Sequence, residues 1–383
     1  MPSPGSRRPR AIDRSPLLVR YAGRSYLADH SPHCVGLVSG RLCPTAVLSG
    51  RAKHSADCWH LSPYGGERPG LSVGNDWLRE VPVSVGTRPK GRRATTPASR
   101  PPAASAYVSG AASEAVRPTI EAPRRPARVL AVLPLALYLE IRSEAEPHVV
   151  AVVTGEATRL PNAVLLAERL GGVSAGDDAW VGEGSIEVGG VSICVRRWWD
   201  PAPPLGAADP ARLAPALGLL GRVRAASPRR PGLVPDGAPA LLDRGCRSGS
   251  LVESITAAER LIGLGPGLTP SGDDMLAGLL VALRHLGAAA GAPRAVWLAN
   301  WLAAAVTYDA RTRTTPISAT LLHCAARGEA SPEVTGVLRG AAGHQPLEPA
   351  VHRLLRLGHT SGADLAWGVQ IGLAAVLAHR EGR

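Results

Sequence analysis

The residues best placed to do chemistry lie in two related segments of the C-terminal half. The first, "GLGPGLTPSGDD", covers residues 263–274, and the second, "HTSGAD", covers residues 359–364. The stretches "SGDDMLAGL" (271–279) and "SGADLAWGV" (361–369) share the pattern S-G-x-D-h-x-x-G-h, in which h is apolar. A threonine lies just upstream of each serine, and each copy begins an apolar helical pattern. Hydroxyl and carboxylate groups are therefore expected at two similar helix starts.

Several kinds of site fit a glycine-rich turn before a helix. A dinucleotide fingerprint needs a preceding strand and a Walker loop needs a lysine, whereas here a helical pattern precedes Gly263 and no lysine follows. Both nucleotide motifs are therefore excluded. Free N–H groups at the helix start suit a small anion, and the adjacent Asp273 and Asp274 suit Mg²⁺. The same carboxylates could instead only cap the helix and stabilise its dipole.

A third polar segment, "RTRTTPIS", covers residues 311–318. Thr315 is a natural N-cap before Pro316, and the two preceding arginines would place guanidinium groups beside free N–H groups, which suits phosphate or carboxylate. His359 could titrate near neutral pH, or only cap or face solvent.

Together the three segments supply the candidate site residues. The candidate catalytic residues are Asp273, Asp274, Asp364 and His359. The candidate substrate- or anion-binding residues are Gly265, Gly267, Thr269, Ser271, Gly272, Arg311, Arg313, Thr314, Thr315, Thr360, Ser361 and Gly362. The candidate metal ligands are Asp273 and Asp274.

The repetition of the motif predicts that the two helix starts meet. Gly278 and Gly368 each follow the motif serine by seven residues and would let the two helices approach closely. Pseudo-symmetry could then place Asp274 and Asp364 around one pocket. A purely structural duplication is the alternative.

The elements that must position these residues indicate an α+β fold. We expect a small antiparallel β domain over residues 105–205, an α-helical domain over residues 206–383 that carries the three motifs, and a disordered basic segment over residues 1–104. The β signals are the run 128–141 with Pro134 at an edge or bulge, a strand over 148–156, and a hairpin that turns at Gly189-Gly190. The stretch "SGAASEAVRPTI" (109–120) is expected to be a short helix. Helical periodicity is clear in six later segments, which are 250–264, 273–287, 292–306, 316–328, 349–358 and 364–380.

The charge of the chain is unevenly distributed. The whole net charge of +12 lies in residues 1–128, and the remainder is balanced, so a nucleic-acid partner for the whole protein is disfavoured. Either residues 1–104 form a basic tail, or a start codon placed too far upstream added them.

The cysteines and the hydropathy pattern limit other classes of protein. Cys34, Cys43 and Cys58 lie among histidines, but no C-x-x-C pair supports zinc. Without an apolar leader or an uninterrupted spanning helix, we expect a cytoplasmic protein with no membrane partner.

The motifs "GLGPGLTPSGDD", "RTTPISATLL" and "GHTSGADLAWG", in this order, resemble the AllH-like family, and the resemblance extends over roughly residues 107–383. Its named member is a subunit of oxamate carbamoyltransferase in allantoin breakdown. The resemblance implies a subunit of a carbamoyltransferase complex whose substrates are oxamate or oxalurate with carbamoyl phosphate or phosphate. A non-catalytic subunit that binds a small anion or holds a metabolic complex together is the alternative, and Mg²⁺ is the only cofactor that the residues suggest.

Overall fold

The computed structural model describes residues 17–21, 24–28, 35–37, 106–142, 146 and 148–381. The chain divides into two compact units, Met1–Asn75 and Asp76–Arg383. In the first unit, three strands form one antiparallel sheet: β1 (Leu17–Tyr21), β2 (Arg24–Ala28) and β3 (Val35–Leu37). The remaining residues of the segment 1–104, including the cysteines considered for zinc, lie outside the described part of the chain.

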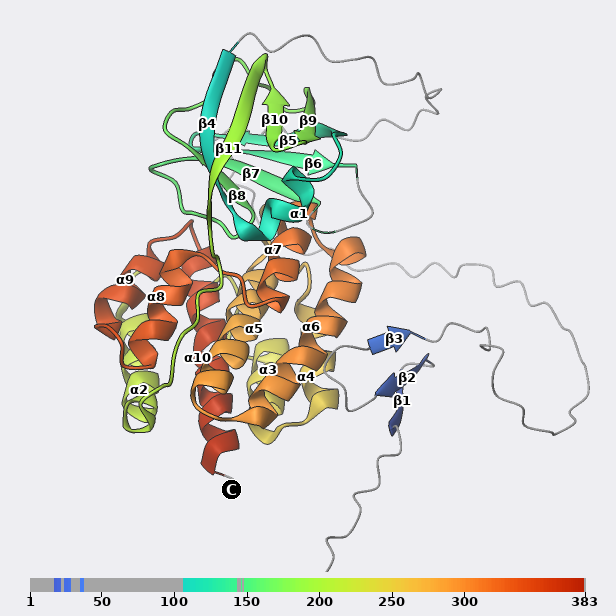
Figure 1. The fold of residues 1–383 in the computed structure, drawn as a ribbon. Helices are drawn as coiled ribbons and strands as arrows, with labels where there is room; N and C mark the ends of the chain where they lie inside the picture. Colours follow the sequence, from blue (N-terminus) through green and yellow to red (C-terminus); the bar gives the residue numbers. More distant parts are fainter. Residues whose placement is uncertain are drawn as a thin grey trace, which may run out of the picture. The chain divides into compact units, whose positions relative to one another are not determined.

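The second unit begins with a closed β-barrel over residues 106–199 (Figure 1). The strand order around the barrel is β10-β11-β4-β8-β7-β6-β5-β9. Its eight strands are β4 (Ala106–Ser113), β5 (Arg125–Leu133), β6 (Ala136–Ile141), β7 (Val149–Thr154), β8 (Ala163–Leu166), β9 (Asp178–Gly182), β10 (Ser185–Val188) and β11 (Val191–Trp199). Because β9 and β10 pair, the sheet closes on itself and has no open edge, and apolar side chains from the strands fill its interior.

The expectation of a small antiparallel β domain is wrong, because the barrel is mixed. β4 pairs with β11 in parallel, and β7 pairs with β8 in parallel. A tight turn in the sequence marks antiparallel neighbours such as β10 and β11, whereas strands that pair in parallel cannot be joined by such a turn and leave no turn signal. The stretch 109–120 is also only partly helical: Ser109–Ser113 belong to β4, followed by the 3-10 turn η1 (Glu114–Val116) and the short helix α1 (Arg117–Ile120).

Two local β predictions can be compared directly with the strands. The run 128–141 forms two paired strands, β5 and β6, that turn at Pro134-Leu135 rather than one strand with a bulge at the proline. The hairpin at Gly189-Gly190 is confirmed, with β10 and β11 on either side. Its two glycines have φ of 58° and 75°, as a type I′ turn requires.

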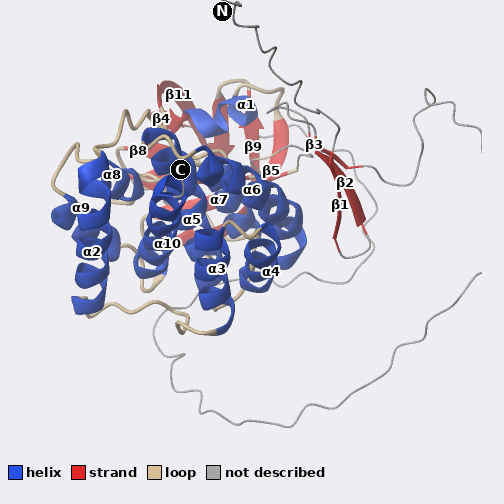
Figure 2. Cartoon of the chain, turned by 90° about the horizontal axis from the view of Figure 1, so that it is seen from below, coloured by secondary structure: helices blue, strands red, loops and turns tan. Residues whose placement is uncertain are grey.

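The helices follow the barrel and share one core. They are α2 (Pro210–Ala226), α3 (Gly237–Ser248), α4 (Leu251–Leu261), α5 (Ser271–Ala289), α6 (Pro293–Arg313), α7 (Pro316–Ala326), α8 (Pro332–Ala341), α9 (Leu347–Leu355) and α10 (Ser361–Glu381). Figure 2 shows α5 and α10 in the middle of this group. Of the described helices, only α10 has the length and apolarity of a membrane span, but 67% of that window is buried, as expected for a core helix.

Close packing of α5 against α10 depends on the two predicted glycines. A Cβ atom at Gly278 would lie 2.2 Å from the backbone oxygen of Leu365, and one at Gly368 would lie 1.9 Å from the backbone oxygen of Met275. No side chain fits at either position, so the expectation that these glycines allow close approach is confirmed. The two contacts are reciprocal, since each glycine faces the residue that follows the motif aspartate of the other helix.

The barrel is held to the helices through α7. Ile317 is buried in a cluster with barrel residues such as Val149 and Ala151, and Leu268 packs against the same cluster. The N–H of Val149 in β7 donates to Oγ1 of the buried Thr320 in α7 at 3.2 Å. The start of α7 and the loop before α5 are therefore fixed against the barrel.

Candidate functional site

The glycine loop before α5 is a tight bend between two helices. Gly263 has a φ of 73°, and a Cβ atom there would lie 2.2 Å from the backbone oxygen of Arg313. A Cβ atom at Gly272 would lie 2.0 Å from the backbone oxygen of Leu261, and one at Gly362 would lie 2.1 Å from that of Leu354. These three glycines are needed for the close passage of the backbone. Two of the predicted binding glycines, Gly272 and Gly362, therefore have a packing role.

The exposed part of the loop contains backbone N–H groups that could bind a ligand. Gly265 and Gly267 are exposed and have φ values of 115° and 98°. Their N–H groups have no acceptor within the described part of the chain. Pro266 lies between them and has no N–H, so the two amides are not successive, but each is available to donate to a ligand.

Asp273 is buried and fully occupied by hydrogen bonds. Its Oδ1 accepts from the N–H of Gly263 at 2.8 Å. Its Oδ2 accepts from Oγ of Ser318 at 2.7 Å and from Oγ1 of Thr314. Asp273 thereby ties the loop before α5 to the start of α7, and neither of its oxygens is left for a substrate.

The starts of α5 and α10 meet through reciprocal hydroxyl contacts. Thr269 Oγ1 lies 3.3 Å from Ser361 Oγ, and Ser271 Oγ lies 3.5 Å from Thr360 Oγ1. The threonine upstream of each motif therefore pairs with the serine of the other copy. We call the group at this junction the helix-start cluster; its members are Thr269, Ser271, Asp274, Thr360, Ser361 and Asp364.

Two carboxylates of the helix-start cluster are buried with one oxygen each unsatisfied. Asp274 is 7% exposed and Asp364 is 0% exposed. The Oδ2 atoms of both residues have no hydrogen-bond partner within the described part of the chain. A buried acceptor without a donor is costly, so such atoms call for a functional explanation. Two of them at one junction favour a ligand that supplies N–H or O–H donors.

Burial dominates the electrostatics of the pair. It raises the pKa of Asp274 to about 7; the nearby charges of Asp364 and Asp273 raise this pKa further, while the hydroxyl groups of Ser361 and Thr269 lower it. Burial also raises the pKa of Asp364. That increase is opposed by the hydroxyl groups of Ser271 and Thr360, by the N–H of Gly232 and by the charge of Arg224. Only Asp364 therefore has a cation that favours its ionised form.

Two residues outside the motifs complete this environment. The N–H of Gly232 donates to Oδ1 of Asp364 at 3.0 Å. Arg224 of α2 lies over the ring of Trp367 at 5.4 Å and donates to Oε1 of Gln370. Burial lowers the pKa of Arg224 to about 10, and Asp364 opposes this shift. No sequence motif marks Gly232 or Arg224 as part of a site. The only signal near them is the helical spacing of the buried apolar residues of α2, which are Leu213, Ala216, Leu220 and Val223.

The third motif contacts the loop before α5 with its threonines, and its arginines lie elsewhere. Thr315 caps α7 as predicted, by accepting from the N–H of Ser318 at 3.1 Å, and donates to the backbone oxygen of Leu268 at 2.5 Å. Arg311 and Arg313 are exposed, and Arg313 pairs with Asp309 at 3.3 Å. Neither guanidinium group contacts the helix-start cluster, and His359 lies exposed beside it.

The residues do not fit the Mg²⁺ site suggested by the adjacent aspartates. Both oxygens of Asp273 already accept hydrogen bonds. Among the described residues, no group of three or more His, Cys, Asp or Glu side chains is placed to hold a metal ion. The chemistry of the helix-start cluster is therefore considered through its hydroxyl and carboxyl groups alone.

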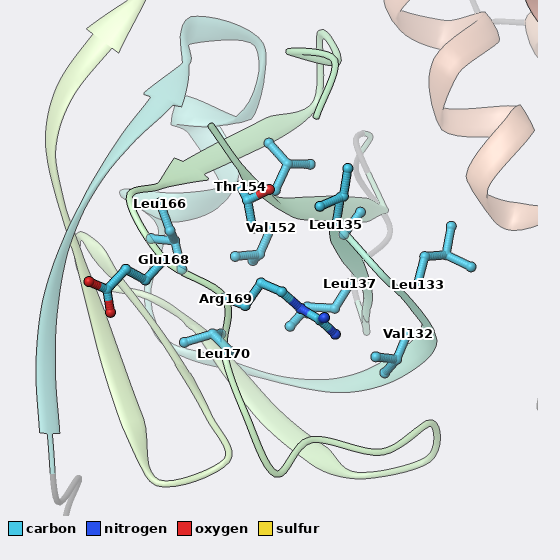
Figure 3. Close-up of a pocket in the computed structure, with 12 residues that line it drawn as sticks. Val132, Leu133, Leu135, Leu137, Val152, Thr154, Leu166, Glu168, Arg169 and Leu170 are labelled. Carbon is cyan, nitrogen blue, oxygen red and sulfur yellow. The ribbon is translucent and has the colours of Figure 1, made fainter. Parts of the chain in front are cut away.

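A pocket on the barrel has different chemistry (Figure 3). No residue of the helix-start cluster contributes to it. Its lining is mainly aliphatic, with Thr154, Glu168 and Arg169 as the polar members; the other lining residues are Val132, Leu133, Leu135, Ala136, Leu137, Val152, Val153, Leu166 and Leu170. Such a surface suits an apolar group better than a small polar substrate.

Comparison with known proteins supports the resemblance stated from the motifs. Residues 261–373 match the family model described as oxamate carbamoyltransferase subunit AllH. The match contains all three polar motifs and the whole helix-start cluster, and it covers less than a third of the chain. The resemblance to this family is thereby confirmed for these residues. No solved structure matches the chain.

Proposed function

We propose that this chain is a subunit of a carbamoyltransferase-type complex in which the helix-start cluster binds a small amide or carboxylate substrate. The substrates would be oxamate and carbamoyl phosphate in one direction, and oxalurate and phosphate in the other. The observation that carries the proposal is the pair of unsatisfied carboxylate oxygens at the meeting point of α5 and α10. The family match over the same residues supports it.

The reaction needs two kinds of interaction that the helix-start cluster and the glycine loop beside it can supply. In the direction of oxalurate synthesis, the amide nitrogen of oxamate attacks the carbonyl carbon of carbamoyl phosphate, the bond from that carbon to the phosphate oxygen breaks, and the nitrogen loses a proton. A buried carboxylate such as Asp364 can accept from the amide N–H. The exposed amides of Gly265 and Gly267 can bind the negative charge that develops on oxygen.

The complex, rather than the chain alone, is the proposed active species. The matched family is named as a subunit, so other subunits of the complex are proposed partners. A non-catalytic anion-binding or scaffold role is the second candidate function. It is favoured by Asp273, Gly272 and Gly362, whose contacts only hold the fold together.

The test is to co-express the chain with the products of its neighbouring genes and to follow phosphate consumption and carbamoyl phosphate formation from oxalurate by ³¹P NMR. The proposal predicts that Asp364→Asn lowers the rate at least tenfold. The control Asp243→Asn changes a surface aspartate of α3 that pairs with Arg247, and it should leave the rate unchanged. Full activity of the Asp364→Asn complex would favour the scaffold role, and a complex without turnover would reject the proposed reaction.

A further inference from the structure

The two copies of the motif are alike in sequence but differ in their surroundings. Gly232 and Arg224 both act on Asp364, and both come from segments that precede the first copy. Among the described residues, the corresponding oxygens of Asp274 have neither a backbone N–H donor nor an arginine; its neighbours are the hydroxyl groups of Ser361 and Thr269. The pseudo-symmetry of the junction is therefore broken at its two carboxyl groups.

This difference assigns opposite hydrogen-bonding roles to two chemically identical side chains. Asp364 has a cation and an N–H donor, which favour a carboxylate that accepts hydrogen bonds. Asp274 is buried beside two other carboxyl groups, which favours a neutral carboxylic acid that donates one. A ligand that satisfies both must offer an N–H donor and a C=O acceptor side by side.

We infer that Asp364 and Asp274 together bind a carboxamide group, with Asp364 accepting from its N–H and Asp274 donating to its carbonyl oxygen. This assignment rests on the proposed function and specifies the substrate class of the same site. Arg224 is then a positioning residue, because it acts through Asp364 and contacts Trp367 and Gln370. A carboxylate ligand of the same size lacks the N–H donor and would meet Asp364 as a like charge.

The backbone at Gly232 packs closely against the helix-start cluster. A Cβ atom there would lie 2.1 Å from Ser271 Oγ and 3.6 Å from Asp364 Oδ2, the unsatisfied oxygen. Position 232 therefore packs against Ser271 of the first motif copy and Asp364 of the second.

The experiment measures direct binding of oxamate and of oxalate to the full chain by isothermal titration calorimetry at pH 6. Oxalate has the size and shape of oxamate but carries a carboxylate in place of the carboxamide. The inference predicts at least tenfold tighter binding of oxamate, because a site built around a hydrogen-bond donor rejects an analogue without it. Equal affinities, or no binding of oxamate, would overturn it.

The same substitution at the two aspartates tests the difference between them. In Asp274→Asn, the amide can still donate to the carbonyl oxygen, so oxamate affinity should stay within about threefold. In Asp364→Asn, the charged acceptor is lost, and affinity should fall at least tenfold. Equal losses in the two variants would contradict the assigned roles.

Two further variants separate binding from folding. Arg224→Gln should reduce the preference for oxamate over oxalate, and Arg224→Lys should restore part of it, which a purely structural role would not produce. Because these measurements follow binding, their failure is distinct from an absence of carbamoyl transfer in the complex.

Discussion

Replacing Asp274 by asparagine is expected to stabilise the protein at alkaline pH. Burial raises the pKa of this carboxyl group to about 7, against 3.8 for the unperturbed group. Below pH 3.8 both the folded and the unfolded chain bind the proton, and between pH 3.8 and 7 only the folded chain keeps it. The free energy of unfolding therefore falls as the pH rises through this window. Above pH 7 the folded protein carries a buried charge that asparagine would not have.

The size of the effect follows from the two pKa values. Each tenfold change in proton affinity corresponds to about 1.4 kcal/mol, so the separation between 3.8 and about 7 amounts to roughly 4 kcal/mol. Most of this is absent at pH 4, because that pH lies only just above 3.8: the folded group is protonated and the unfolded group has lost only part of its proton. The stability gap between Asp274→Asn and the wild type should therefore widen by several kcal/mol between pH 4 and pH 8.5.

Urea unfolding of both proteins at pH 4, 6 and 8.5 measures this gap. Asp273→Asn is the matched control, because it makes the same chemical change one residue earlier. Asp273 accepts from Gly263, Thr314 and Ser318, so turning an NH₂ group toward any of these donors should cost about 1–3 kcal/mol across this pH range. A gap for Asp274→Asn that does not change with pH would refute the reasoning.

Three further substitutions test the scaffold, and urea unfolding measures each of them. Gly368→Ala should lower the free energy of unfolding by about 2 kcal/mol, because its Cβ atom would lie 1.9 Å from a backbone oxygen of α5. In the control Gly218→Ala, the Cβ atom meets only an arginine side chain at 3.4 Å, so this variant should be neutral or more stable. An unchanged free energy of unfolding for Gly368→Ala would contradict the close packing of α5 and α10. Gly189→Pro should destabilise the barrel by about 2 kcal/mol or more, since proline cannot adopt the φ of 58° in the hairpin; an unchanged midpoint would exclude this turn. Thr320→Val should lower the free energy of unfolding by about 1–3 kcal/mol, because it removes the acceptor of the Val149 N–H. Hydrogen exchange of the Val149 amide should become faster in this variant. Unchanged exchange would show that this hydrogen bond does not connect the barrel to the helices.

The fold was predictable where the signal is local. The hairpin at Gly189-Gly190 and the apolar helices after Ser250 follow from turn chemistry and helical periodicity. The barrel closes through parallel pairs such as β4–β11, whose partners lie far apart in the chain and share no turn. Helix α2 was not expected because Pro215 lies inside it and Pro-rich sequence precedes it.

The site was predictable where one motif repeats. The two S-G-x-D segments do bring their hydroxyl and carboxyl groups to one junction, as their resemblance indicated. Arg311 and Arg313 were chosen because they precede a helix start, but sequence distance does not fix the direction of a long side chain, and both are exposed. Gly232 and Arg224 act on Asp364 from segments with no recognisable motif, so only the packed structure associates them with the site.

The contribution of these two residues bears on how a duplicated motif acquires function. Two identical helix starts in contact would present two equivalent carboxyl groups. Equivalent groups have the same protonation state, so one could not donate a hydrogen bond to the ligand while the other accepts one. Part of the difference lies inside the repeat, where Asp273 in the first copy corresponds to Ala363 in the second, and the rest comes from α2 and from the segment that contains Gly232. A variant that removes the positive charge of Arg224 should therefore make the two aspartates more alike, so that asparagine substitutions at 274 and 364 then have similar effects on oxamate affinity. If the two substitutions keep their different effects in an Arg224→Gln background, Arg224 is not the source of the asymmetry.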